Sequence, residues 1–279
     1  MSQEAFKIAY RAETIATFEQ TYSDLRLACV QEATTNAATA TFLVAGSGGA
    51  SAVTRGINGQ IAYGVIDNTQ TTCTLTEKHA PFETTDFNVF ASQGNQKAIM
   101  QQASIGTLNR DIDDVIVAQL DTATQDTATA VEATQDLVEM ALTILGNADV
   151  PVEEEDKMFG IITPAFRSML RQNTTFASGD YVETKPLMGP VRKMWRWAGI
   201  NWLVSRRLTG KGTSSEKCYI MHQHSMGHAA NSTAMKVTVG YEEKQQNSWT
   251  NASLFHGARL LQNTGIVQVL HDGSRYVAA

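Results

Sequence analysis

The feature that most constrains this chain is a long β-ribbon pattern that is polar on both faces. Ile61, Tyr63 and Val65 alternate with small residues, turn-forming residues follow at 67–69, and a Thr-rich alternation continues over 71–77. A two-stranded ribbon is at best marginally stable in water when it is isolated. The pattern therefore predicts a hairpin that lies on another surface.

Helical periodicity flanks this ribbon on both sides. Before it, a narrow apolar stripe at helical spacing predicts an early helix, through Ile8, Ile15, Phe18, Tyr22, Leu25 and Cys29. So narrow a stripe must dock onto the chain's own body or a neighbour. After the ribbon, a clear 3.6-residue period predicts a long helix over 95–123, and a second helix follows over 131–145, where Gly146 supplies a C-cap.

The rest of the chain reads as a mixture of strands and short helices. The patterns predict strands over 158–162, 200–208, 217–222, 235–241 and 265–270, and helices over 164–170 and 258–261. No internal repeat at solenoid periods is present. The predicted fold class is α+β.

Composition narrows the function classes. Charged residues make up 18% of the 279 residues, against roughly 25% in typical soluble proteins, while the apolar share is an ordinary 43%. Disorder is excluded, and a surface short of charge suggests coverage by partners. The net charge of −6 gives no support to nucleic-acid binding, and three dispersed cysteines indicate reduced thiols. The sequence contains no run of about 20 apolar residues, and from the acidic, non-apolar residues at its start we expect no signal peptide.

Three histidines offer the best metal-like spacing. His222 and His224 lie two apart on a predicted strand, so they share one face, and His228 supplies a third ligand. On this alternative interpretation, the protein is a metal-dependent enzyme that uses His222, His224 and His228. The competing interpretation is that these are exposed or interface histidines after the end of a strand.

A basic and aromatic cluster spans residues 192–207. It contains Trp195, Trp197 and Trp202 interleaved with basic residues that include Arg206 and Arg207. Such a cluster can stack bases, neutralise phosphates or lie on a membrane surface. Because the chain is acidic, we favour tryptophans packed inside and arginines that pair with acids of another chain.

No other part of the sequence matches a motif for catalysis or for phosphate binding. The acidic residues at 111–114 and 153–156 could in principle serve acid–base or metal chemistry, but no basic or His partner lies close to them in sequence. We therefore interpret them as solvated faces or salt-bridge partners. Residues 46–49 and 210–213 lack the spacing of phosphate-binding loops, and no nucleophile motif is present. We therefore expect no catalytic residue, no cofactor and no metal.

The order of elements, with several short stretches, resembles a known family. Thr54–Gly56, Ile61–Tyr63 and Asp67–Gln70 are followed by Lys78–Phe82 with Asp86, and then by Leu108–Asp113. Together these resemble the major capsid proteins of tailed bacteriophages, whose fold is shared with the floor of the herpesvirus capsid. The resemblance covers nearly the whole chain.

This resemblance implies the phage major capsid fold, with an N-terminal arm, an extended β-hairpin called the E-loop, a long spine helix, and peripheral and axial domains. The implied boundaries are an arm over 1–41, the E-loop hairpin and return strand over 42–94, the spine helix of the peripheral domain over 95–130, a mainly axial domain with peripheral strands over 131–257, and a C-terminal closing strand over 258–279. The implied function is a structural subunit of an icosahedral capsid that forms pentamers and hexamers around packaged double-stranded DNA.

The resemblance also implies partners and a location. The main partner is the chain itself; a portal, decoration proteins and weakly contacted DNA are further partners, with no membrane. A separate scaffolding protein is expected because no long helical pro-segment precedes the arm. The expected location is the virion capsid, reached from the host cytoplasm. The expected intersubunit contacts are Arg55, Trp195, Trp197, Trp202, Arg206 and Arg207, with core packing as the alternative for the tryptophans.

Overall fold

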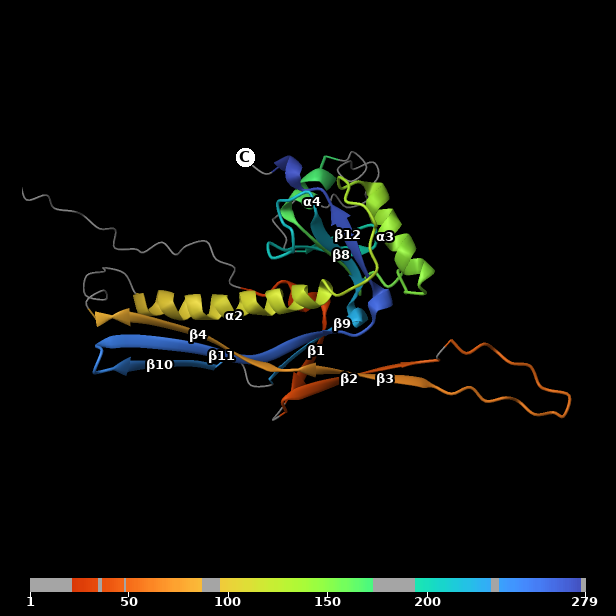
Figure 1. Cartoon of the computed structure of the whole chain (residues 1–279), viewed down its shortest axis with the longest axis horizontal. Coiled ribbons are helices and arrows are strands. Elements are labelled where there is room, and N and C mark those ends of the chain that lie inside the picture. The colour runs from red at the N-terminus through yellow and green to blue at the C-terminus, as the bar shows by residue number, and fades with distance from the viewer. Residues whose placement is uncertain are drawn as a thin grey trace, which may run out of the picture.

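The computed structural model describes residues 22–34, 37–47, 49–86, 96–172, 194–231 and 236–276. It has an elongated shape: a long sheet carries one helix, a compact lobe stands at one end of that sheet, and a hairpin projects past the lobe (Figure 1). None of the described helices is long and apolar enough to cross a membrane.

The long sheet is built around its longest strand. Its order is β1-β9-β11-β10, and β4 pairs with the other edge of β11. The strands are β1 (Val30–Thr34), β4 (Thr76–Thr85), β9 (Met226–Asn231), β10 (Lys236–Glu242) and β11 (Asn247–Leu260). Helix α2 (Gln96–Leu120) lies over β11 and β4, and its apolar stripe, which includes Leu108, Ile112 and Ile116, is buried. Burial of this stripe, rather than helix propensity, stabilises α2.

The compact lobe is formed by a second five-stranded sheet and two helices. Its strand order is β12-β8-β5-β7-β6. The elements are α3 (Gln135–Asn147), β5 (Met158–Ile162), α4 (Pro164–Leu170), β6 (Met194–Trp197), β7 (Ile200–Val204), β8 (Glu216–His222) and β12 (Ile266–His271). All five residues of β5 are buried, as expected for the central strand of a covered sheet.

Strands β2 (Thr39–Gly46) and β3 (Asp67–Thr74) form an antiparallel hairpin with Thr39 opposite Thr74. At its root, Phe42 and Cys73 are buried against Ala229 of β9. Gly257 of β11 lets the end of β3 approach closely, because a β-carbon there would lie 2.4 Å from the carbonyl oxygen of Thr74. Beyond the root, the hairpin projects away from the body of the molecule (Figure 1).

The two sheets are joined at the C-terminal end of α2. The buried side-chain amide of Gln268 in β12 donates to the carbonyl oxygens of Leu120, Asp121 and Ala123, at 3.4, 3.1 and 2.7 Å. The carboxylate of Asp121 also accepts hydrogen bonds from Tyr219 and Thr209. These contacts satisfy carbonyl groups that a helix end leaves without partners, and they tie α2 to the compact lobe.

Most of the predicted elements are confirmed. The long periodic segments become α2 and α3, and the short helix with Pro164 in its first turn becomes α4 with Thr163 as its N-cap. The strand predictions correspond to β5, β7, β8, β10 and β12, although the strand predicted over 200–208 ends at Val204.

Three predictions are wrong where the structure describes the residues. The early helix is not continued through Leu25 and Cys29: a short 3-10 helix, η1 (Leu25–Ala28), leads directly into β1, and residues 1–21 lie outside the described ranges. The alternation at 61–65 is not a strand, and the turn expected at 67–69 is the start of β3. The helix expected at 258–261 is the end of β11, because this segment pairs with β9.

Candidate assembly surface

The most exposed apolar side chains of the described residues lie at the end of the hairpin. Residues 49–66, which we call the tip loop, connect β2 to β3 with no helix or strand among them, and all are exposed. Tyr63 is 95% exposed and Val65 86%. The other large apolar side chains exposed in the tip loop are Val53, Ile57, Ile61 and Ile66. An exposed apolar patch of this kind marks a surface that another molecule covers.

Backbone hydrogen bonds fold the end of the tip loop into a tight turn. The amide of Gly56 donates to the carbonyl of Gln60 at 2.9 Å, and the amide of Gly59 donates to the carbonyl of Gly56 at 2.9 Å. Gly59 has a φ of 74°, which favours glycine. Arg55, an expected intersubunit contact, lies beside this turn and is exposed. The tip therefore presents one cation among apolar groups.

The three tryptophans of the basic cluster lie inside the compact lobe. Trp202 is fully buried, and its indole nitrogen donates to the carbonyl of Trp197 at 3.0 Å. Trp195 and Trp197 are also buried, and the guanidinium of Arg167 lies 5.3 Å from the centre of the Trp195 ring. Their burial supports the core alternative for these side chains. It also argues against the base-stacking interpretation, which needs exposed rings.

The arginines of this cluster have different surroundings. Arg206 is exposed, whereas the guanidinium of Arg207 forms an ion pair with Asp114 of α2 at 3.5 Å. Arg192 lies outside the described residues. The arginines predicted to reach another chain are thus one exposed side chain and one that is already paired within this chain.

The histidines do not form a metal site. His222 and His224 lie edge to face with ring centres 4.9 Å apart, and the Nδ1 of His222 accepts a hydrogen bond from the amide of His224. His228 lies instead in β9 beside His256, with ring centres 5.8 Å apart. Across the described ranges, no group of three or more His, Cys, Asp or Glu side chains lies where it could hold a metal ion. The metal-enzyme interpretation is therefore wrong for these residues.

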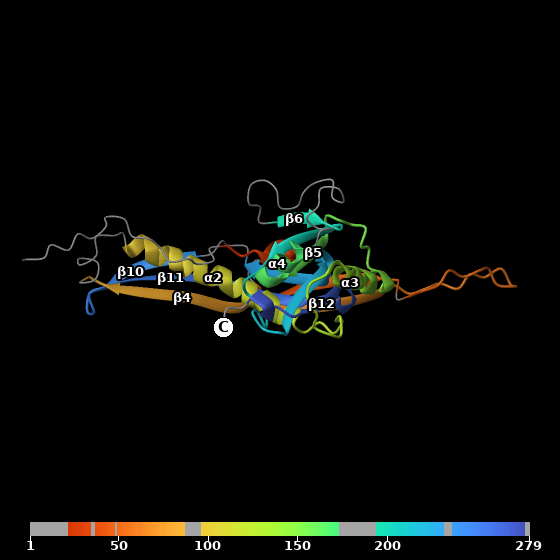
Figure 2. The same ribbon diagram turned by 90° about the horizontal axis from the view of Figure 1, so that it is seen from above.

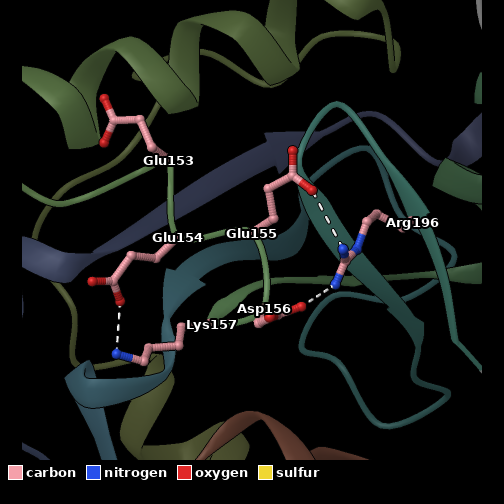
Figure 3. A pocket seen from close by; sticks show the side chains of 6 residues that line it. All are labelled: Glu153, Glu154, Glu155, Asp156, Lys157 and Arg196. Carbon is pink, nitrogen blue, oxygen red and sulfur yellow. Dashed lines mark hydrogen bonds and ion pairs between the residues drawn. The ribbon is translucent and has the colours of Figure 1, made fainter.

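The acidic run at 153–156 lines a surface pocket together with Lys157 and Arg196 (Figure 3). Arg196 forms ion pairs with Glu155 and Asp156, and Lys157 forms one with Glu154 at 2.7 Å. The expectation of salt-bridge partners is confirmed for these three acids. Exposed pairs of this kind contribute little to stability, so we interpret the pocket as a charged, solvated part of the surface.

A partly buried polar cluster between α2 and the long sheet, centred on the buried His256, was missed by sequence reasoning. The Nε2 of His256 lies 2.9 Å from the carboxylate of Asp111, which also pairs with Lys78 at 3.3 Å. Burial lowers the pKa of His256, and it lowers the pKa of neighbouring His228 to about 3, assisted by the positive charge of Arg26. The partners are up to 145 residues apart, so no sequence pattern indicates them.

Solved structures with the same fold are shells of phages and related particles. The chain aligns over 96% of its length with 98% of a chain from Mycobacterium phage Che8, with a TM-score of 0.75 at 15% identity. It covers 98% of a chain from the capsid of Ralstonia phage GP4, using 99% of its own length, with a TM-score of 0.73 at 8% identity. A chain from the capsid of the native GTA particle gives 0.70 at 12% identity, covering 96% of each chain. The fold is therefore that of tailed-phage capsid proteins.

The sequence itself leads to the same class. No curated protein matches the chain. The model of the family described as phage capsid protein matches residues 3–273, which is nearly the whole chain. The chain belongs to this phage capsid protein family, and it is a structural protein of the virion, as the resemblance predicted.

Proposed function

We propose that this chain is the subunit that self-assembles into the pentamers and hexamers of an icosahedral capsid enclosing double-stranded DNA. The observation that carries the proposal is the tip loop, which holds six large exposed apolar side chains on a hairpin that projects away from the body. Side chains placed in this way stabilise nothing within their own chain, so their coverage needs neighbouring copies.

Within this proposal, each region takes one part of the capsid subunit. The hairpin of β2 and β3 with the tip loop is the E-loop, and α2 is the spine helix. The long sheet with α2 forms the peripheral domain, and the compact lobe forms the axial domain. The proposed ranges are an arm over 1–41, the E-loop hairpin and return strand over 42–94, the spine helix over 95–130, a mainly axial part with peripheral strands over 131–257 and a closing strand over 258–279. The boundaries at 41 and 257 fall within β2 and β11, so each of these strands is shared by two ranges.

We assign the contacts between copies to side chains that are exposed in the single chain. Arg55 in the tip loop and Arg206 after β7 are the exposed cations that we assign to intersubunit contacts. Arg207 is paired with Asp114 and Trp195, Trp197 and Trp202 are buried in the lobe, so we assign these four residues to holding the segment of the lobe that carries Arg206. The net charge of −6 suits a container that holds DNA loosely.

The remaining roles follow the capsid assignment. We propose assembly in the host cytoplasm with a separate scaffolding protein and a portal, followed by residence in the virion, where decoration proteins are further partners. No catalytic activity is part of this proposal.

Negative-stain electron microscopy of the purified full chain, with and without its scaffolding protein, tests the function. We expect closed shells, rings or tubes built of hexamers and pentamers. A chain that stays monomeric at high concentration with the scaffold present would contradict the proposal.

A further inference from the structure

An open strand edge borders the long sheet beside α2. Strand β10 ends the strand order of this sheet, and none of the described strands pairs with its outer edge. Figure 2 shows β10 and β4, the strand that forms the other flank, on opposite sides of α2. An open edge presents a row of backbone N–H and C=O groups that can pair with a strand of another chain.

The two flanks of the sheet differ in how they are protected against such pairing. Strand β4 contains Pro81, which has no backbone N–H to donate, and the charged residues Glu77, Lys78 and Glu83. Natural edge strands use prolines and charges of this kind to prevent pairing with other chains. The central residues of β10, Val-Thr-Val-Gly-Tyr over 237–241, include neither. Of these two flanks, β10 is therefore the one that is open to a partner strand.

Three exposed apolar side chains follow β10 on one face, and we call them the apolar row. Val237, Val239 and Tyr241 are 39%, 57% and 49% exposed. They share a face because side chains alternate along a strand. The hydroxyl of Tyr241 donates to Asp86 at 2.6 Å, so the ring is held in place while about half of it contacts solvent. Apolar side chains beside an open edge favour a partner strand that brings apolar groups of its own.

The charges on the other face match a second copy of the same strand. Lys236 begins β10 and Glu242 ends it, so Val239 is the central residue, and both charged side chains are exposed. In an antiparallel pair centred on Val239, Lys236 lies opposite Glu242 of the partner subunit, and the same contact repeats at the other end. Opposite charges that face each other across two strands stabilise the pair.

We propose that β10 pairs antiparallel with β10 of a second copy of this chain, about a two-fold axis through the two Val239 residues. This register gives every residue of β10 a partner, from Lys236 to Glu242. It sets Val237 opposite Tyr241 of the partner subunit, so the two apolar rows form one continuous stripe. A shift by two residues would leave two residues of each β10 strand unpaired and would separate the opposite charges.

This contact differs from the contacts that close a ring of subunits. A ring needs head-to-tail contacts between two different surfaces of each copy, whereas a two-fold contact uses the same surface twice. The pairing of β10 would join two long sheets into one continuous sheet across the axis. It therefore adds a contact that ring closure does not supply, and it does not rest on the proposed function.

Oxidation of single-cysteine variants of the full chain tests the register. All three native cysteines are buried, so a new surface thiol reacts on a quiet background. We expect a covalent dimer from Val239→Cys, because residues opposite each other in an antiparallel pair have Cα atoms about 4.5–5.5 Å apart. Val237→Cys is the matched control, since its two copies would lie four residue steps apart, or about 13 Å, too far for a disulfide. Equal dimer yields from the two variants would overturn the proposal.

Exchange of the charges tests the same pairing in the Val239→Cys background. Lys236→Glu sets two carboxylates opposite each other at both ends of the pair, and we expect the dimer yield to fall about fivefold or more. Adding Glu242→Lys restores opposite charges, so the yield should recover. A yield that does not respond to Lys236→Glu, or that Glu242→Lys fails to restore, would contradict the contact.

Electron microscopy of the Val239→Cys chain, kept reduced, separates this proposal from the capsid assignment. Shells from a chain that gives no covalent dimer on oxidation would contradict the pairing of β10 and leave the proposed function standing. A covalent dimer from a chain that forms no shells would support the pairing and contradict the proposed function.

Discussion

The tip loop and the sheet of the compact lobe place similar apolar residues in opposite surroundings. In the lobe, Ile161, Ile200 and Trp202 are fully buried among paired strands. In the tip loop, Ile57, Tyr63 and Val65 contact solvent, and none of the described strands pairs with them. The apolar residues of the lobe therefore stabilise the fold of the chain, whereas those of the tip loop are the ones that we propose neighbouring copies cover. Substitutions in the two regions should separate folding from assembly.

The largest expected effect is the loss of shells when the tip loop is made polar. We expect Ile57→Ser combined with Tyr63→Ser to abolish assembly while changing the free energy of unfolding by less than about 0.5 kcal/mol, since surface substitutions rarely cost more. Electron microscopy and urea denaturation measure the two quantities. The control is Gln60→Ser, also in the tip loop, and shells formed by the double variant would contradict the assignment.

The largest expected effect on stability lies in the lobe. Trp202→Ala removes a fully buried indole that packs against Gly160 and Phe166, and we expect it to cost about 3–5 kcal/mol. Urea denaturation of the unassembled chain measures this cost, with Tyr63→Ala as the control. A cost below about 1 kcal/mol for Trp202→Ala would show that the lobe is not the folding core.

Acidic pH should lower the stability of the fold, because His228 is buried in its neutral form beneath α2. Its pKa is lowered to about 3 from an ordinary 6.5, so below pH 6.5 the unfolded chain binds more protons and stability falls as pH falls. Lowering the pH from about 6.5 to 5 should reduce the free energy of unfolding of the wild type. We expect this reduction to be about 2 kcal/mol smaller in His228→Leu, which lacks the titrating group. Unfolding titrations at several pH values measure the difference. Identical slopes for the two proteins would contradict burial of a neutral His228.

The smallest of these effects concerns the joint between the sheets. Gln268→Leu leaves the carbonyl groups at the end of α2 without their side-chain donor, and we expect a cost of about 1–2 kcal/mol. Gln102→Leu, at an exposed position of α2, is the matched control. Equal stabilities of the two variants in urea would show that Gln268 does not hold the joint.

Long periodic elements were predictable because local pattern and tertiary burial agree in them. The period through Leu108 and Ile116 repeats over many turns, so α2 follows from the sequence. Predictions failed where distant pairing overrides local preference. The segment from Leu25 to Cys29 has helical spacing, but β1 pairs with β9 about two hundred residues later.

The existence of a covered hairpin was predictable from the sequence, but the conformation of its residues was not. The low charged fraction and the polar ribbon indicated a covered hairpin. The alternation at Ile61–Val65, however, suggested a strand, and no partner strand pairs with these residues in the described chain. The cluster of His256, Asp111 and Lys78 joins three distant segments, and only the fold brings it together.

The central claim is that the tip loop is covered when copies assemble. Hydrogen exchange of residues 49–66, compared between unassembled subunits and purified shells, tests it most directly. We predict that these amides exchange rapidly in the free subunit and at least about tenfold more slowly in the shell. Equal exchange in both states would contradict the claim.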